Sequence, residues 1–569
     1  MLPECPLDPL RYIGNVVEVT PSFVKIYMPK INSLPEGHYL KDDNSYGFEV
    51  GEFIIIECKK CVIFGRVTSV KLPREDTRGI DIKFAENKYY NMISTVQMLA
   101  TVDTENWNVG RGVKIYPCVG SKTYSAHPQL ITWVAESNSR VGNNADNLTL
   151  NIANLQDYTD TPVKLLPEQM FSRHCAILGT TGGGKSWTIA KLIEETIKYR
   201  SKVILFDPSG EFHTMDKDVV HLKFGKEESI SQNAKEIVLP YTSLNENDLF
   251  SIFNPSGQQI PKIRAAMKSL KLARLEPWLT KEGVIIKSNQ QKTKFEQLYR
   301  QYSSIIDSPV ALFDITKLNH QIEEECVWSS NRTFPARWGG YNDEQRSECV
   351  SLLSRIEDVL SSPELSCIFN VRGKRSVLTE IDNFISNDNV RILRISLENV
   401  SFSHNAREVI ANAIGRYILA KAREGCFLMN PVVLFLDEAH HFLNKLTNDH
   451  NENRLNSFEL IAKEGRKFSL NICLATQQPR DIPEGVLSQM GTILVHRLIN
   501  DNDREVIEKA CGEFNKTLTS FLPNLLPGEA IVIGVDFPIP VTMKIQIPTF
   551  RPDSSGPDFQ KYWRYNINV

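Results

Sequence analysis

The part of the sequence best suited to chemistry is a glycine-rich segment that ends in a lysine and a serine. Its pattern, Gly179-x-x-x-x-Gly184-Lys185-Ser186, is the complete phosphate-loop spacing. Glycines let several backbone N–H groups point at one anion, and a following helix adds its dipole at the same place. The pattern therefore predicts an ATP site, in which Lys185 reaches the β- and γ-phosphates and Ser186 holds Mg²⁺. The residues expected to contact ATP are Gly179, Thr180, Thr181, Gly182, Gly183, Gly184, Lys185, Ser186 and Trp187.

A pair of acids could supply the second half of this chemistry. Residues 432–436 are a purely apolar run, as a central parallel strand should be, and Asp437 and Glu438 follow it directly. After a phosphate loop, Asp437 is expected to order the Mg²⁺ shell, and Glu438 to polarise the attacking water. His440 and His441 come next, but two adjacent histidines without a spaced third ligand more often pack or hydrogen-bond than bind a metal.

Two further polar residues follow predicted strands. Asp207 comes after the apolar run 202–206, where it would either order water or metal or serve as an ordinary turn acid before Pro and Gly. The pattern alone favours neither of these readings. Gln477 follows the predicted strand 470–475, and a polar residue there can touch the γ-phosphate and sense hydrolysis.

Arg466 lies just before the strand that ends near Gln477. An arginine at this place could stabilise the transition-state charge on the ATP of a neighbouring subunit. The alternative is a surface arginine that pairs with Glu464 or Glu459, which would contribute under about 1 kcal/mol.

The elements that must position these residues alternate between strands and helices. Apolar runs at 175–178 and 202–206 flank a helical pattern at 186–199, which is a βαβ unit. The predicted fold is α/β, a RecA-like phosphate-loop ATPase core with an N-terminal small β-barrel and a helical insertion. From residue 390 the alternation resumes, and further elements are expected at 390–397, 405–424, 432–436, 470–475, 492–495, 501–511, 530–535 and 541–547.

The N-terminal region reads as short strands rich in Val, Ile and aromatic residues, separated by Gly, Pro, Asn and Asp. Many short strands in about 150 residues predict a small barrel, which we expect to serve assembly or docking rather than catalysis. The expected strands are 13–19, 23–28, 53–57, 62–70, 80–84, 113–116, 131–135 and 148–152.

The insertion, from about residue 240 to 385, is dominated by helical patterns such as 263–275 and 344–360. Two of its clusters would suit nucleic acid, although a solvated helix face and an ordinary packed loop are the favoured readings. The basic cluster comprises Lys262, Arg264, Lys268, Lys271 and Arg274. The aromatic–arginine cluster comprises Trp328, Arg332, Phe334, Arg337, Trp338 and Tyr341.

Composition limits the remaining possibilities. The 569 residues include 65 basic and 68 acidic side chains, a net charge of −3, so any nucleic-acid contact must be local. There is no apolar run of 18 residues and no export signal at the N-terminus, so we expect a cytoplasmic protein without membrane contact and with reduced thiols. Cys58 and Cys61 form a lone CxxC pair, which we interpret as strand-end residues rather than zinc ligands.

Taken in order, these motifs resemble the HerA family of hexameric DNA translocases, within the wider HerA–FtsK class. The resemblance covers most of the chain and implies a ring homo-hexamer with ATP at subunit interfaces and duplex DNA in a central channel. It also implies an effector partner, a nuclease or a sirtuin-like protein, in DNA-end processing or antiphage defence. The residues that carry it are 173–179, Asp207-Pro208-Ser209-Gly210-Glu211, Leu436-Asp437-Glu438-Ala439-His440, Glu464-Gly465-Arg466-Lys467 and Ala475-Thr476-Gln477-Gln478-Pro479.

By position, the resemblance implies that Lys185, Asp207 and Glu438 are catalytic and that Arg466 is an arginine finger. Three further residues would brace the nucleotide, namely Arg173, Phe550 and Arg551. The implied domains are a barrel at 1–155, an ATPase core at 156–239 and 386–569, and the insertion at 240–385. The alternative is a protein-remodelling or secretion-type ATPase of the VirB4-like kind, which shares the ATP site but works at membranes.

Overall fold

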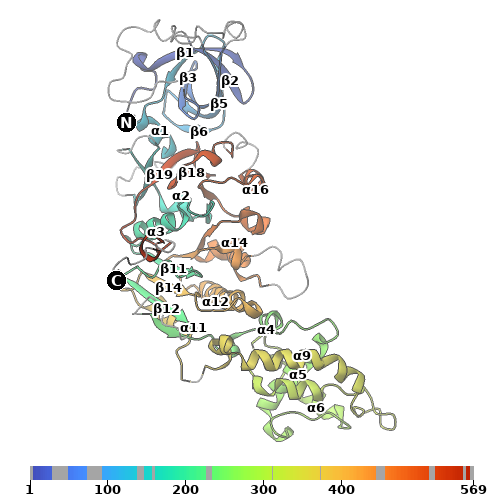
Figure 1. The fold of residues 1–569 in the computed structure, drawn as a ribbon. Coiled ribbons are helices and arrows are strands. Elements are labelled where there is room, and N and C mark those ends of the chain that lie inside the picture. The colour runs from blue at the N-terminus through green and yellow to red at the C-terminus, as the bar shows by residue number, and fades with distance from the viewer. Residues whose placement is uncertain are drawn as a thin grey trace. The chain divides into compact units, whose positions relative to one another are not determined.

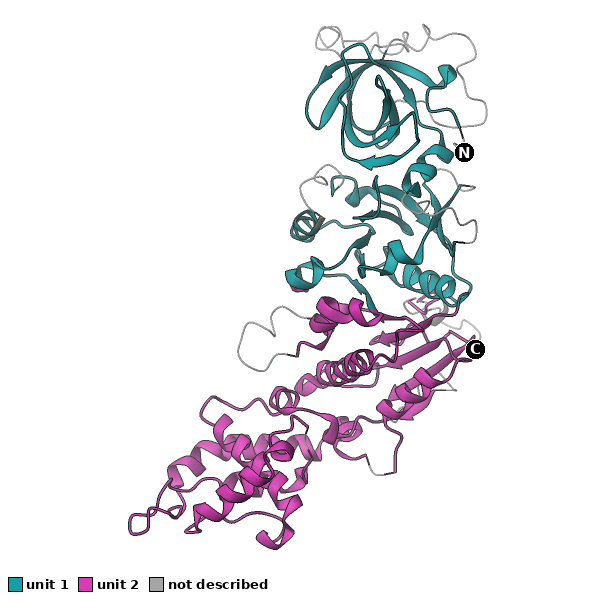
Figure 2. Cartoon of the chain, turned by 180° about the vertical axis from the view of Figure 1, so that it is seen from behind, with its two compact units in different colours: residues 1–199, 471–480, 484–551 teal, residues 200–470, 481–483, 552–569 magenta. Residues whose placement is uncertain are grey.

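The chain forms two compact units in the computed structural model. One unit comprises residues 1–199, 471–480 and 484–551, and the other comprises residues 200–470, 481–483 and 552–569 (Figure 2). The structure describes residues 4–28, 49–72, 92–137, 147–156, 161–225, 234–310, 312–371, 373–443, 455–511, 519–554 and 559–563.

The first unit begins with a small barrel (Figure 1). Its strands follow the order β2-β1-β7-β3-β4-β5-β6, and a further pairing of β2 with β5 closes six of them into a ring. Inward-facing side chains such as Val24, Ile54 and Val96 are almost completely buried and fill its core. The predicted N-terminal barrel is therefore confirmed. Its strands are β1 (Tyr12–Val19), β2 (Phe23–Met28), β3 (Phe53–Glu57), β4 (Cys61–Lys71), β5 (Met92–Asp103), β6 (Val109–Arg111) and β7 (Lys122–Ser125).

Some of the strands expected in this region have other structures. Residues 131–135 belong to helix α1 (Pro128–Ala135), which starts with a proline at its first position and a His127 side-chain cap. Residues 113–116 are irregular rather than a strand. The strand expected at 148–152 is β8 (Leu150–Leu155), which pairs with β19 (Val541–Ile545) instead of joining the barrel. The strand expected at 80–84 lies outside the described residues.

The second half of this unit is a sheet built around the strand that enters the phosphate loop. β10 (Cys175–Leu178) is fully buried and lies in parallel between β16 (Leu470–Thr476) and β17 (Thr492–Val495). β18 (Glu529–Gly534) continues the sheet in the antiparallel sense, followed by β19, β8 and β9 (Pro162–Leu165). Its helices are α2 (Pro167–Phe171), α3 (Lys185–Thr196), α15 (Glu484–Leu487) and α16 (Asp501–Cys511).

The second unit contains a set of parallel strands. β11 (Lys202–Asp207) lies between β14 (Ile392–Ser396) and β15 (Val432–Leu436), and all three strands are completely buried. β12 (Val219–Phe224) pairs with β14, and β13 (Lys235–Ile237) pairs with β12. The carboxyl ends of parallel strands lie along one edge of a sheet. Asp207 and Asp437 are both found at such strand ends. In the chain, helix α12 (Ala406–Arg423) follows β14, and helix α14 (Ser457–Glu464) follows β15.

The insertion is helical, as predicted, and its helices surround small apolar clusters such as Leu272, Ile285 and Phe295. One buried ion pair lies inside it, between Lys287 Nζ and Glu325 Oε2 at 2.5 Å. None of the described helices is long and apolar enough to span a membrane. The helices of this part are α4 (Glu246–Phe253), α5 (Ile260–Leu275), α6 (Lys292–Gln301), α7 (Ser303–Ile306), α8 (Leu318–Glu324), α9 (Asp343–Ser361), α10 (Ser366–Phe369) and α11 (Val377–Ser386).

Candidate nucleotide site

The phosphate loop runs from the end of β10 to the start of α3. Gly182 and Gly184 have φ angles of 73° and 114°, a region that glycine enters without a steric penalty. Within the described residues, the backbone N–H groups of these two glycines have no protein acceptor. The loop therefore holds oriented donors that an anion could satisfy, as the phosphate-binding prediction requires.

The side chains around the loop agree with this reading. Lys185 is buried, and its Nζ donates to the Thr180 carbonyl at 3.1 Å, so the ammonium lies over the loop. The Thr181 hydroxyl donates to the Gln477 side-chain oxygen, which brings the end of β16 to the loop. Gln477 is thus placed beside the loop, where a contact with the γ-phosphate is feasible.

A histidine that sequence reasoning did not single out as a site residue lies beneath the loop. His496 follows β17 directly and is completely buried. Its Nδ1 lies 2.7 Å from the Glu529 carbonyl oxygen, and its Nε2 lies 2.8 Å from the Thr188 hydroxyl on α3. Burial is the main reason that its pKa is lowered to about 4, so the ring is neutral at physiological pH. The only sequence signal was a histidine directly after a buried strand.

The strand-end acids belong to the other unit. Asp437 is 2% exposed, and burial raises its pKa well above the usual value, with the charges of Glu438, Asp207 and Glu211 adding to the shift. A bound divalent cation stabilises the charged form of a carboxylate that is desolvated and surrounded by like charges, so it lowers the free energy of the folded protein. The residues therefore fit the Mg²⁺ that the sequence predicts.

Glu438 has an unusual backbone. Its φ and ψ angles are 44° and 52°, a left-handed conformation that is uncommon for residues other than glycine. Its Oε2 lies 3.4 Å from Nδ1 of His440, and the centroid of the His440 ring lies 4.3 Å from that of His441, with the two rings tilted by 39°. Strain of this kind persists where the surroundings fix it and is frequent at functional sites. The histidines thus contact the acid and each other, as the packing interpretation expected.

Asp207 is placed differently from the other acids. Its two oxygens accept hydrogen bonds from the backbone N–H groups of Gly210, at 2.8 Å, and Phe212, at 3.1 Å. Arg394, itself 1% exposed, donates from Nε to Asp207 Oδ2 at 2.7 Å. These contacts use the carboxylate to close its own turn, so they favour the turn-acid reading over the catalytic one.

Arg466 is exposed in the short turn that follows α14. The two acids considered as its surface partners have other partners. Glu464 pairs with Arg423 at 2.8 Å, and Glu459 pairs with Lys463 at 2.5 Å. In the described part of the chain, no acid pairs with the Arg466 guanidinium, which leaves it available to a neighbouring molecule.

The three remaining predicted nucleotide contacts are Arg173, Phe550 and Arg551. Arg173 precedes β10, at the end of the strand opposite to the loop, and packs against Gly491. The tail is tied to the last turns of α3, where the Thr549 backbone N–H donates to Glu194 at 2.6 Å.

The basic cluster and the aromatic–arginine cluster of the insertion have different surroundings in the structure. The basic residues of α5 are largely occupied, with Arg264 on Glu246 at 2.5 Å and Lys268 on Asp307 at 2.8 Å. Of the aromatic–arginine cluster, Trp338 packs against Phe295, whereas Trp328 and Phe334 are 55% and 58% exposed. The basic cluster is thus mainly a surface helix face, and the aromatic loop is only partly packed.

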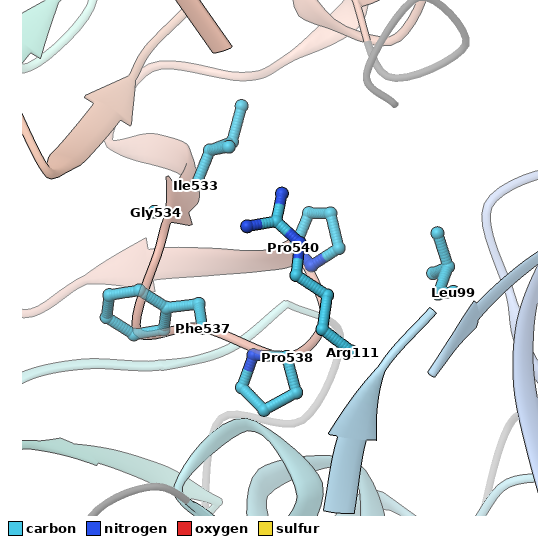
Figure 3. A pocket seen from close by; sticks show the side chains of 7 residues that line it. All are labelled: Leu99, Arg111, Ile533, Gly534, Phe537, Pro538 and Pro540. Atoms are coloured by element: carbon cyan, nitrogen blue, oxygen red, sulfur yellow. The ribbon is translucent and has the colours of Figure 1, made fainter. Parts of the chain in front are cut away.

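A pocket away from the loop lies in the first unit (Figure 3). It is formed by Leu99 of β5, by the end of β6, and by the end of β18 with the connection to β19. Its one charged side chain is Arg111, so it lacks the acids and nucleophiles that chemistry would need. The lining residues are Leu99, Arg111, Ile533, Gly534, Phe537, Pro538 and Pro540.

Comparison with solved structures finds ATPases at low sequence identity. VirB4 of Thermoanaerobacter pseudethanolicus is 14% identical with a TM-score of 0.45, and covers 71% of this chain and 97% of that chain. The bacterial conjugative coupling protein TrwB is also 14% identical with a TM-score of 0.43, and covers 71% of this chain and 90% of that chain.

Sequence comparison is more informative. A probable helicase of Methanocaldococcus jannaschii is 24% identical over 515 residues, which is 87% of this chain and 86% of that protein. The DNA double-strand break repair helicase HerA of Saccharolobus solfataricus is 25% identical over 400 residues, 69% of this chain and 68% of that protein. The family described as Helicase HerA, central domain, matches residues 150–414, and the family described as Helicase HerA-like C-terminal matches residues 428–545. The two matches together span well over half of the sequence, and the chain belongs to the HerA family.

Proposed function

We propose that the chain is an ATP-driven DNA translocase or helicase that works as a ring homo-hexamer around duplex DNA in the cytoplasm. The observation that carries this proposal is the phosphate loop with its unsatisfied N–H donors, followed in a HerA-family chain by the buried acid pair Asp437 and Glu438. Names of relatives support the DNA-handling part, since several are repair helicases.

Each residue of the proposed site has a defined role. Lys185 and the loop N–H groups bind the phosphates, and Ser186 and Asp437 hold Mg²⁺, which neutralises phosphate charge. Glu438 polarises the attacking water, and Gln477 senses the γ-phosphate. Asp207 acts through its turn, by holding the strand end beside the acids.

The test of hydrolysis uses Glu438→Gln. The amide keeps the shape of the side chain but cannot activate water, so ATP binding should remain while turnover falls by about 10²-fold or more. Lys185→Ala should instead weaken nucleotide binding. Glu464→Gln, which alters only an exposed pair with Arg423, is the matched control. Wild-type turnover in the Glu438 variant would contradict the assignment.

The DNA role is tested by whether duplex DNA raises the rate of ATP turnover. Because the chain is nearly neutral, DNA contact must be local and electrostatic, and affinity should fall roughly tenfold or more from low to physiological salt. If the ATP-bound protein has no affinity for duplex DNA, the protein-remodelling, VirB4-like alternative is favoured.

Arg466 is proposed to act on the ATP of a neighbouring subunit, since its two candidate surface partners are occupied. Such an arginine contributes about 10³-fold or more to turnover. Arg466→Ala and Glu438→Gln subunits should each be nearly inactive, and mixed rings should regain part of the activity. If mixing restores nothing, Arg466 does not act in trans.

An effector, either a nuclease or a sirtuin-like protein, is proposed to dock on the N-terminal barrel, in DNA-end processing or antiphage defence. The barrel supports this because six of its described strands form a closed ring. Removal of residues 1–137 should abolish effector binding or ring assembly more than nucleotide binding. An unchanged number of subunits per particle by light scattering, with the effector still bound, would reject this docking role.

A further inference from the structure

Three glycines of the phosphate loop pack against the buried side chain of His496. A Cβ atom added to Gly179 would lie 2.6 Å from the His496 Cβ, and one added to Gly184 would lie 3.3 Å from its Cε1. At Gly183 the corresponding distance to the His496 Cβ is 3.4 Å. The loop backbone therefore packs directly against the His496 side chain.

The hydrogen bonds of the ring fix its tautomer. The Glu529 carbonyl can only accept, so the proton of the neutral ring is on Nδ1, at 2.7 Å from that oxygen. The Nε2 lone pair then accepts from the Thr188 hydroxyl at 2.8 Å, and it shares that single proton with the Gly184 carbonyl at 3.0 Å. One side of the ring is thus bound to the first residue of β18, and the other to the first turn of α3.

A second bond ties the same two segments together. The backbone N–H of Gly528 donates to the Gly183 carbonyl at 3.1 Å, one residue before Glu529. The ring also faces the positive charge of Lys185, which together with burial keeps it neutral. A protonated ring would lose its Nε2 acceptor and place a second cation under the loop.

We propose that His496 is a positioning residue for nucleotide binding, which holds the loop and the start of α3 in their phosphate-binding arrangement without touching the nucleotide. The inference rests on the proposed ATP site. Because the ring is completely buried under the loop, its effect reaches the phosphates through the loop glycines and Thr188. The neutral tautomer is the form that satisfies Glu529 and Thr188 at once.

The bond between His496 and Thr188 can be removed from either side in the full-length protein. His496→Asn keeps a donor near the Glu529 carbonyl but cannot reach Thr188, and Thr188→Val removes the hydroxyl at nearly constant volume. Each should weaken ATP binding, measured by titration calorimetry, by about tenfold, because a buried partner is left unsatisfied. The double variant should be no weaker than the single ones, since both remove the same bond.

The control is His320→Asn, which changes an exposed histidine of α8 in the other unit and should leave ATP affinity unchanged. Melting temperatures without nucleotide separate loss of affinity from loss of folding. The pH profile of binding between pH 6 and pH 8 should be the same in wild type and in His496→Asn, because the ring is already neutral there.

The outcomes are distinct. If the wild-type protein does not bind ATP, the proposed function fails. If it binds ATP but both single variants bind equally well, or if their effects add fully, the positioning role is rejected. If His496→Asn removes a limb of the pH profile, the ring acts as a titrating group instead.

Discussion

Two buried aspartates end adjacent parallel strands of the second unit, and their surroundings are opposite. Asp207, after β11, accepts two backbone N–H bonds and the guanidinium of Arg394. Asp437, after β15, stands among like charges that raise its pKa further above the value that burial alone would give. The backbone N–H of Asp437 even donates to Phe206, the neighbour of Asp207, at 3.2 Å.

This difference separates a structural acid from a functional one. A buried charge whose hydrogen bonds and counter-ion are all supplied by the protein has no need of a ligand. A buried carboxylate with acidic neighbours raises the free energy of the empty site and is stabilised when a cation binds. By this criterion, we propose Asp437 and Glu438 as the acids for Mg²⁺ and water, and Asp207 as a structural support for them.

The largest effect is expected for Asp207→Asn. The substitution leaves the Arg394 guanidinium buried, with its counter-ion lost, so the free energy of unfolding should fall by about 3–5 kcal/mol. Urea denaturation measures this. Asp388→Asn, which breaks only the exposed pair with Arg200, should change it by less than about 1 kcal/mol. A variant with unchanged stability and no turnover would restore the catalytic reading of Asp207.

The role of Asp207 could not be read from the sequence because its partner is distant in the chain. Arg394 lies 187 positions further on, and only the parallel pairing of β11 with β14 brings the two together. The phosphate loop and the acid pair were predictable because each is a local pattern at a strand end. His496 was missed for the same reason as Arg394, since its contacts are all made by residues far away in sequence.

Local propensity misled the prediction at one point of the fold. Residues 131–135 are mostly β-branched or aromatic, which favours a strand, yet they form α1. Pro128 begins the helix and the His127 side chain accepts from the Gln129 N–H, so the helix start signals outweigh the residue preferences. Seven of its eight residues are buried, which shows that tertiary packing decides the outcome.

A smaller effect of opposite sign is expected for Asp437→Asn. Removing a desolvated charge beside Glu438 should raise the free energy of unfolding of the nucleotide-free protein by roughly 1–3 kcal/mol. Because the folded pKa of Asp437 is raised, its contribution to stability is complete below the unfolded pKa and is lost as pH rises through the folded pKa.

The stability gain of Asp437→Asn should therefore be larger at pH 8 than at pH 5, which urea denaturation at the two pH values checks. Added Mg²⁺ and ATP should stabilise the wild type more than the variant. A stability gain that is independent of pH would mean that the charge of Asp437 does not destabilise the folded protein.

Glu438→Gly tests the backbone strain of the same region. Glycine adopts a φ of 44° without a steric penalty, so the variant should gain up to about 1 kcal/mol in unfolding free energy while losing ATP turnover. Thermal unfolding and a steady-state ATPase assay report the two quantities. Loss of both stability and turnover would mean that the Glu438 side chain contributes packing that the structure does not reveal through its hydrogen bonds.

The smallest effect on stability is expected for Arg466→Ala, which contrasts with the buried Arg394. The guanidinium of Arg394 compensates Asp207, whereas Arg466 is exposed and pairs with no acid in the described part of the chain. Truncation of Arg466 should therefore change the unfolding free energy by less than about 0.5 kcal/mol. If Arg466 acts in trans, ATP turnover should nevertheless fall by about 10³-fold, but only in assembled rings. A turnover loss that accompanies a comparable loss of stability would place Arg466 with Arg394, as a structural arginine.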